Sequence, residues 1–236
     1  MNTGAIIWAI CGGLLAALPA HAANFIPPKG CEVYMTAQLH NCQVANFYTC
    51  SADDAGDQWV SYADGEGAYF LSHIDRETRW IEAYSLETGE IDLLDQAASK
   101  DNASFSDLLA SGRDDYDFIT HNNFAQTLRY VGADTLTGES VTIDGVPLEK
   151  CSFNLSAYDA QGQKLSTRQG VQYISRKHRI FLSGPESYEN ASGEKQSFDD
   201  SPARFDFPGD PGFSTETPEY DCDMMMTGIS PAGRRG

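Results

Sequence analysis

The sequence predicts a mainly β protein, with a single curved antiparallel meander sheet that is half-barrel-like and one short helix near residues 104–112. From Trp59 onward, apolar residues recur with the period of strands rather than helices. The links between these runs are short, and Asp144-Gly145 is typical of a tight hairpin turn, because both residue types tolerate positive φ. Links this short cannot hold parallel crossovers, so we expect every strand pair to be antiparallel.

The expected strands follow one another with polar turns between them. They are residues 57–63, 68–75, 80–86, 91–94, 115–121, 124–134, 138–144, 146–159, 164–175 and 178–187. Beyond Tyr188 the composition changes to Pro, Gly, Ser and acidic residues, which predicts an extended, loop-like return.

The one expected helix has recognisable ends. Ser104 is a suitable N-cap, and Asp107 three residues later gives a variant of the capping box. Phe105, Leu108 and Leu109 form a short apolar stripe, after which Gly112 is a natural stop.

The chain begins with the pattern of a secretory signal peptide. An apolar run from residue 5 to residue 18 precedes Pro19 and the small-residue pattern Ala20-His21-Ala22, which predicts cleavage after Ala22. The run has about fourteen residues, whereas a membrane span needs roughly twenty. We therefore expect a signal peptide at 1–22, a single β-rich domain at 23–223 and a disordered tail at 224–236.

The charge balance excludes one class of partner. The chain has 34 acidic and 16 basic residues and a formal net charge of −18. A charge of this sign repels nucleic-acid phosphates and disfavours docking on anionic membranes. The sequence therefore predicts a soluble, acidic, exported protein, periplasmic or secreted, with no stable membrane insertion.

The stretch CEVYMTAQLHNCQVANFYTC, residues 31–50, offers the soft metal ligands Cys31, His40, Cys42 and Cys50. It contains no C-x-x-C pair, and cysteines in an oxidising compartment mostly form disulfides. The acidic clusters at 53–57 and 64–66 do not fit the D-x-D-x-D-G calcium loop. We expect no metal and no cofactor.

Disulfide pairing can be narrowed by hairpin geometry. Six cysteines less Cys11 in the signal peptide leave five, an odd number. If His40-Asn41 forms a two-residue turn, facing residues have numbers that sum to 81, so that Cys31 faces Cys50. Leu39 then faces Cys42, and Cys222 could tie the C-terminal segment to Cys42. Cys151 remains as the expected buried free thiol.

No catalytic signature is present: the sequence lacks G-x-S-x-G, S-x-x-K and H-E-x-x-H. Four histidines remain after the signal peptide, and His73 and His178 flank charged turns, as half-exposed strand residues do; the others are His40 and His121. A triad can assemble from separated strands, so an exported hydrolase stays an alternative.

Residues 130–184 contain the run GADTLTGESVTIDGVPLEKCSFNLSAYDAQGQKLSTRQGVQYISRKHRIFLSG. Its rhythm of strands and turns resembles the long successive hairpins of the bacterial outer-membrane lipoprotein carrier family, and the whole chain looks like exported proteins of Gram-negative bacteria. The resemblance implies a strongly curved antiparallel sheet whose concave face holds apolar ligands. The carriers cover that face with several helices and lack the three-cysteine opening, so no binding residue is carried over.

The expected function is therefore non-catalytic: a periplasmic protein that binds an apolar small molecule, a lipid or a cell-envelope protein on its curved sheet. Two alternatives stay open, the exported hydrolase and a structural or interaction module without a pocket. The aromatic side chains of the expected strands could equally fill an ordinary core.

Overall fold

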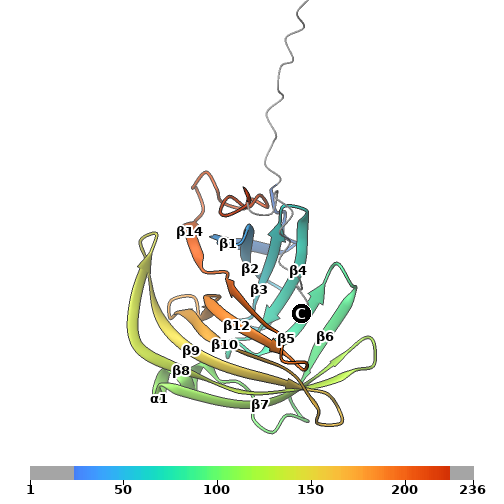
Figure 1. Ribbon diagram of the computed structural model, residues 1–236. Helices are drawn as coiled ribbons and strands as arrows, with labels where there is room; N and C mark the ends of the chain where they lie inside the picture. The colour runs from blue at the N-terminus through green and yellow to red at the C-terminus, as the bar shows by residue number, and fades with distance from the viewer. Residues whose placement is uncertain (1–23, 224–236) are drawn as a thin grey trace, which may run out of the picture.

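The computed structural model describes residues 24–223, which form one open, mainly antiparallel β sheet with a single short helix (Figure 1). The predicted fold class is confirmed. The predicted signal peptide, 1–22, and the predicted tail, 224–236, lie outside the described residues. None of the described residues belongs to a helix that is both long and apolar enough to cross a membrane.

The elements follow the chain in a simple order. They are β1 (Cys31–Leu39), β2 (Gln43–Cys50), β3 (Gln58–Asp64), β4 (Gly67–Ile74), β5 (Trp80–Ser85), β6 (Glu90–Asp95), α1 (Phe105–Ser111), β7 (Arg113–Asn122), β8 (Thr127–Ile143), β9 (Val146–Tyr158), β10 (Lys164–Ser175), β11 (Ile180–Leu182), β12 (Pro185–Asn190), β13 (Lys195–Asp199) and β14 (Pro202–Asp206).

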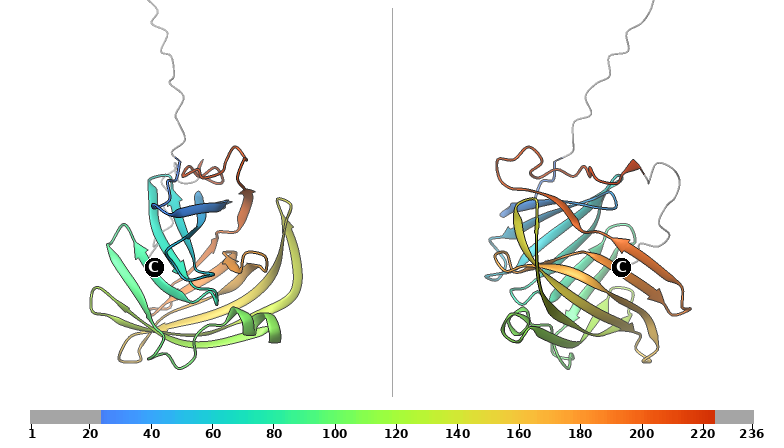
Figure 2. Two further views of the ribbon diagram at one scale, coloured as in Figure 1. Left: turned by 180° about the vertical axis from the view of Figure 1, so that it is seen from behind. Right: turned by 60° about the vertical axis from the view of Figure 1, so that its left-hand side comes forward.

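The sheet is a meander from β1 to β10, in which each strand pairs with the next. β12 and β13 continue it beyond β10, while β14 pairs with β1 at the opposite edge. Only residues 200–201 connect β13 to β14. The two edges of the sheet therefore come close together at this corner, and the strongly curved strands β7 to β10 bring them there (Figure 1 and Figure 2).

The main core lies where the curved sheet packs on itself. Buried side chains of β1, β2, β3 and β14 pack against those of β9 and β11; they are Met35, Ala37, Leu39, Ala45, Phe47, Val60, Leu148, Ile180, Leu182 and Phe205. This part of the inside of the sheet is filled by ordinary apolar packing, which is the main source of folding free energy.

The helix α1 forms as predicted and closes a second cluster. The Ser104 hydroxyl accepts a hydrogen bond from the Asp107 amide, and Gly112 ends the helix at φ 82°. Phe105 and Leu108 pack on Cys151 of β9 and Ile174 of β10. Successive side chains of a strand point to opposite faces, so β11 serves both clusters: Phe181 contacts the helix cluster while its neighbours join the main core.

The first hairpin differs from the prediction at its turn. Cys31 does face Cys50, but Leu39 faces Gln43 rather than Cys42. The turn has three residues, His40 to Cys42, instead of two, and an irregularity between Val33 and Met35 compensates for the extra one. The predicted register is therefore right at the disulfide and wrong at the turn.

Three other expectations are wrong. β8 is one strand that runs through residues 137–139 as a large bulge, whereas two strands were expected. The expected strand 178–187 is divided between β11 and β12, and residues 195–206 form β13 and β14 instead of a loop. Pairing partners supplied by the rest of the sheet, rather than local propensity, explain these strands.

The irregular return does follow β14, and it covers one face of β1 and β2. Gln38 and Asn46, both essentially buried, donate side-chain hydrogen bonds to the carbonyls of Thr217 and Thr215. The segment thus satisfies polar groups that would otherwise be buried without partners.

Candidate functional site

A row of four aromatic and acidic side chains crosses the sheet from β2 to β5. Tyr48, Trp59, His73 and Glu82 are direct pairing partners on successive strands and so share one face. The Trp59 ring stacks on His73 at 4.3 Å with an interplanar angle of 6°. Tyr48 and Tyr84 stack beside the same indole, each at 6.2 Å. The result is a continuous aromatic surface centred on Trp59.

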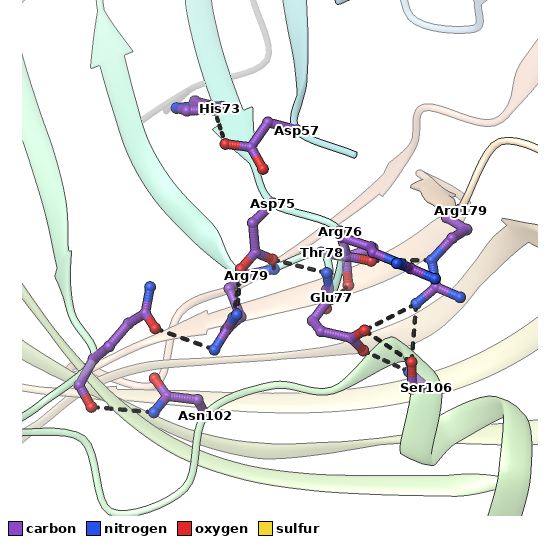
Figure 3. Close-up of polar contacts among 11 residues, drawn as sticks. Asp57, His73, Asp75, Arg76, Glu77, Thr78, Arg79, Asn102, Ser106 and Arg179 are labelled. Atoms are coloured by element: carbon purple, nitrogen blue, oxygen red, sulfur yellow. Dashed lines mark hydrogen bonds and ion pairs between the residues drawn. The ribbon is translucent and has the colours of Figure 1, made fainter. Parts of the chain in front are cut away.

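His73 lies between two carboxylates. Its Nε2 is 3.1 Å from Asp57 Oδ2, and its Nδ1 is 3.0 Å from Glu82 Oε1 (Figure 3 shows the contact with Asp57). An ionised carboxylate only accepts, so the ring satisfies both partners when both nitrogens carry protons. His73 is only 7% exposed, so the expectation of a half-exposed strand residue is wrong.

Two groups beside the ring, Asp57 and Tyr84, have shifted pKa values. Burial raises the pKa of Asp57 above its usual range, while His73 acts in the opposite direction. The Tyr84 hydroxyl donates a 2.6 Å hydrogen bond to Glu82, and this bond raises the pKa of Tyr84 to about 12. The ring, the two acids and the tyrosine are therefore held as one fixed group.

An apolar pocket of about 340 Å³ lies against this aromatic surface. Rings and aliphatic side chains, together with the Cys31–Cys50 disulfide, form most of its wall; the lining residues are Pro28, Lys29, Gly30, Cys31, Tyr48, Cys50, Ala52, Asp53, Trp59, Leu71 and Tyr84. The Trp59 Nε1 already donates a 2.8 Å hydrogen bond to Asp53. The indole N–H therefore already has a partner, and Trp59 offers the pocket no unsatisfied donor.

A second, polar pocket of about 510 Å³ adjoins the first, and the two share Cys50 and Asp53 in their walls. The connection between β2 and β3 forms one side of it, with Asp53, Asp54 and Asp57. The turns after β4 and β10 also line it, with Arg76 and residues 177–179, and Arg76 packs against Gly56 of that connection.

The turn after β4 is fixed by hydrogen bonds (Figure 3). Asp75 Oδ1 accepts the amides of Glu77 and Arg79, and its Oδ2 accepts Arg79 Nε at 2.6 Å. The Glu77 carboxylate accepts from Ser106 of α1 and from Arg179 Nη2. These contacts join α1 to the turns after β4 and β10. They fix the backbone of the part of the polar pocket that carries Arg76 and Arg179.

The cysteines make no chemical site. Both expected disulfides are present, Cys31–Cys50 and Cys42–Cys222. Cys151 is the free cysteine of the described residues, and it is completely buried. Burial raises the pKa of its thiol to about 12, so the reactive thiolate does not form at neutral pH. Among residues 24–223, no three His, Cys, Asp or Glu side chains are grouped so as to hold a metal ion.

One triad-like contact occurs, on the exposed face of β6 to β8. His121 Nδ1 lies 2.9 Å from Thr127 Oγ1, and His121 Nε2 lies 3.2 Å from Asp95 Oδ2. The His121 side chain is 49% exposed, and none of the three residues lines either pocket described above. His121 and Thr127 face each other directly in the β7–β8 ladder, so cross-strand pairing accounts for the contact.

The opposite face of the sheet carries another aromatic cluster. Trp80, 44% exposed, makes edge contacts with Phe118 at 5.6 Å and with Tyr130 at 5.8 Å. Phe118 and Tyr130 are themselves stacked at 5.1 Å. Phe118 and Tyr130 belong to a small hydrophobic cluster, and Trp80 packs against both rings. Apolar packing in a satellite core therefore accounts for this cluster.

No protein-family model, curated protein or solved structure matches the chain. The case for a function therefore rests on the two adjoining pockets and on the side chains that line them.

Proposed function

We propose that this protein is a non-catalytic binding protein of the periplasm that takes up a small apolar molecule bearing a ring. The apolar pocket beside Trp59 carries the proposal. Ligand pockets typically have volumes of about 300–1,000 Å³ and are lined mainly by apolar and aromatic side chains with a few polar groups at the edge. The pocket of about 340 Å³ fits that description.

The geometry favours a ring as the bound group. Trp59 is flanked by Tyr48 and Tyr84, so the wall is a set of fixed aromatic surfaces. His73, held by two carboxylates, stacks on the indole and supports it. Rigid aromatic walls lose little conformational entropy on binding and stack well on another ring.

The proposed location rests on the signal-peptide pattern and on the disulfides. Two disulfides are typical of an oxidising compartment such as the periplasm. One of them, Cys31–Cys50, also forms part of the pocket wall. Reduction of the protein should therefore weaken ligand binding as well as stability.

The test uses the neutral fluorescent probe N-phenyl-1-naphthylamine and the variant Ala52→Trp. Ala52 is an exposed residue that lines the pocket, so a large side chain there should fill the pocket without removing any core contact. We expect the wild type to bind the probe and Ala52→Trp to lose at least about tenfold in affinity. Ala97→Trp, at an exposed turn far along the chain, is the matched control.

Probe fluorescence that does not rise with wild-type protein, or that rises equally with Ala52→Trp, would overturn the proposal. Circular dichroism and the urea midpoint of each variant establish that a loss of binding is not a loss of folding.

A further inference from the structure

The polar pocket beside the aromatic one is lined by charged side chains of both signs. Asp53, Asp54 and Asp57 lie on the connection between β2 and β3. Arg76 and Lys177 lie on the turns after β4 and β10. Arg179 lines the pocket as well, so three cationic and three acidic side chains meet there in a chain whose net charge is −18.

Several charges of this pocket already have partners. Arg179 pairs with Glu77 at 3.2 Å, and Asp57 pairs with His73 at 3.1 Å. Asp53 accepts the indole N–H of Trp59. These groups form the fixed part of the wall.

Three other charges have no ion pair with any residue between 24 and 223. They are Asp54, Arg76 and Lys177, although all three line the same pocket. The aliphatic part of Arg76 packs against Gly56, where an added Cβ would lie 2.9 Å from Arg76 Cβ. Lys177 Nζ lies 5.8 Å from the centre of the Phe207 ring. Both side chains are exposed, and each packs against a neighbouring residue without an ion-pair partner in the described part of the chain.

The arrangement also sets the order of groups along a ligand. Asp53 belongs to both pockets, so a molecule whose ring lies against Trp59 meets the acidic side first. Arg76 and Lys177, on the turns after β4 and β10, line the polar pocket but not the apolar one. A ligand suits these regions in turn if it has a ring, then a cationic group, and an anionic group beside or beyond the cationic one.

We infer that the ligand is an aromatic zwitterion with the chemistry of an aromatic α-amino acid. Its ring stacks in the apolar pocket, its ammonium group lies beside Asp53 and Asp54, and its carboxylate lies beside Arg76 and Lys177. Charge-assisted hydrogen bonds of this kind give direction and specificity that an apolar pocket lacks. The inference rests on the proposed function, because it assumes that the apolar pocket takes the ring.

The test is isothermal titration calorimetry with four probes. Phenylalanine has the ring and both charges, phenethylamine lacks the carboxylate, 3-phenylpropionate lacks the ammonium group, and alanine lacks the ring. We expect phenylalanine to bind at least about fivefold more tightly than either singly charged compound, and alanine to bind most weakly. Equal binding of the three ring compounds would overturn the inference while leaving the proposed function intact.

Two variants link the preference to the named side chains. Asp54→Asn should lower the affinity for phenylalanine and phenethylamine but not for 3-phenylpropionate. Arg76→Gln combined with Lys177→Gln should lower the affinity for phenylalanine and 3-phenylpropionate but not for phenethylamine. Glu87→Gln and Lys164→Gln, both at exposed positions outside the pockets, are the matched controls.

A zwitterionic lipid headgroup is the competing source of the same two charges. Short-chain phosphatidylethanolamine places its anion next to the apolar tail and its cation at the tip, the reverse of the order inferred here. If this lipid binds more tightly than phenylalanine, the inference is wrong. If no probe binds, and the neutral naphthylamine does not bind either, the proposed function fails together with it.

Discussion

Asp114 on β7 and Asp134 on β8 lie directly opposite each other in the sheet, and each is only 8% exposed. Asp114 accepts the Ser104 amide at 2.8 Å, and Asp134 accepts Gln172 Nε2 at 2.6 Å. Burial raises the pKa of Asp114 to about 6 and that of Asp134 to about 7. Repulsion from Asp114 further raises the pKa of Asp134, and repulsion from nearby acids further raises that of Asp114. The folded protein is therefore more stable when at least one of these two carboxyl groups is protonated.

The free energy of unfolding should consequently fall as pH rises from 5 to 8. The folded-state pKa values of the two acids, about 6 and about 7, lie above the unfolded value of 3.8. The stability that the protonated groups contribute is therefore fully present below pH 3.8 and is lost as pH rises through the folded-state pKa values. At about 1.4 kcal/mol per pKa unit, the part of this loss that falls between pH 5 and pH 8 should be about 4 kcal/mol. Urea denaturation across this pH range measures the effect.

The variant Asp134→Asn isolates this pair from other titrating groups. The amide keeps an acceptor for Gln172 and carries no charge, so we expect it to be more stable than wild type at pH 8 and to depend less on pH. His178, whose pKa burial lowers, acts in the opposite direction and is unchanged in the variant. A pH slope equal to that of wild type would contradict the assignment, and Glu87→Gln is the surface control.

The Cys151 thiol should be unreactive in the folded protein. It is fully buried under α1, and its raised pKa, about 12, keeps it protonated. We expect no reaction with a disulfide reagent at pH 8 in native buffer and one thiol per chain in guanidinium, for protein beginning at Ala23. Stoichiometric labelling of the native protein would show that the helix opens readily.

The two disulfides should contribute unequally to stability. Cys31–Cys50 spans 19 residues and Cys42–Cys222 spans 180. The loop-entropy relation gives about 3 kcal/mol for the first and about 5 kcal/mol for the second. We therefore expect the Cys42→Ser, Cys222→Ser double variant to have the lower urea midpoint, because it also releases the return that covers Gln38. A lower urea midpoint for the variant without Cys31–Cys50 would mean that the C-terminal segment after β14 stays packed on β1 without its disulfide.

Removing the ring of His73 should destabilise the fold by about 2–4 kcal/mol, because two partly buried carboxylates lose the ring nitrogens that they contact, and the stack on Trp59 is lost. The change His73→Ala should also shift Trp59 emission to the red, since the indole loses the ring stacked on it. Thermal unfolding and the emission maximum are the measurements. His121→Ala, on an exposed face, should change stability by less than about 1 kcal/mol, and equal effects of the two variants would contradict this account.

The aromatic row could not be found by counting from its turn. Trp59 pairs with His73, but an irregularity between Tyr62 and Ala63 shifts the β3–β4 register by one residue. A count from the Asp64–Gly67 pair would place Trp59 opposite Ser72 and put His73 on the other face. The aromatic surface therefore depends on one bulge that no local sequence signal marks.

At the cysteines, the pairing could be predicted from the sequence, but the length of the hairpin turn could not. The odd cysteine count and the hairpin register led to both disulfides and to the free Cys151. The two-residue turn assumed for that register was wrong, and the pairing survived because a bulge offset the third turn residue. Agreement at Cys31–Cys50 thus came from two compensating irregularities.

The sequence by itself determined the β class, the helix with its Ser104 and Gly112 ends, and the type I′ turn at Asp144-Gly145, since these depend on local periodicity and on residues that tolerate positive φ. Only the tertiary structure decided which strands form the edges, where bulges reset the register, and which side chains meet. The joining of Trp59 with His73, and of Asp54 with Arg76 and Lys177 around one pocket, depends on pairings between distant segments. Such pairings are selected by the total burial and hydrogen bonding of the whole sheet, which no single segment encodes.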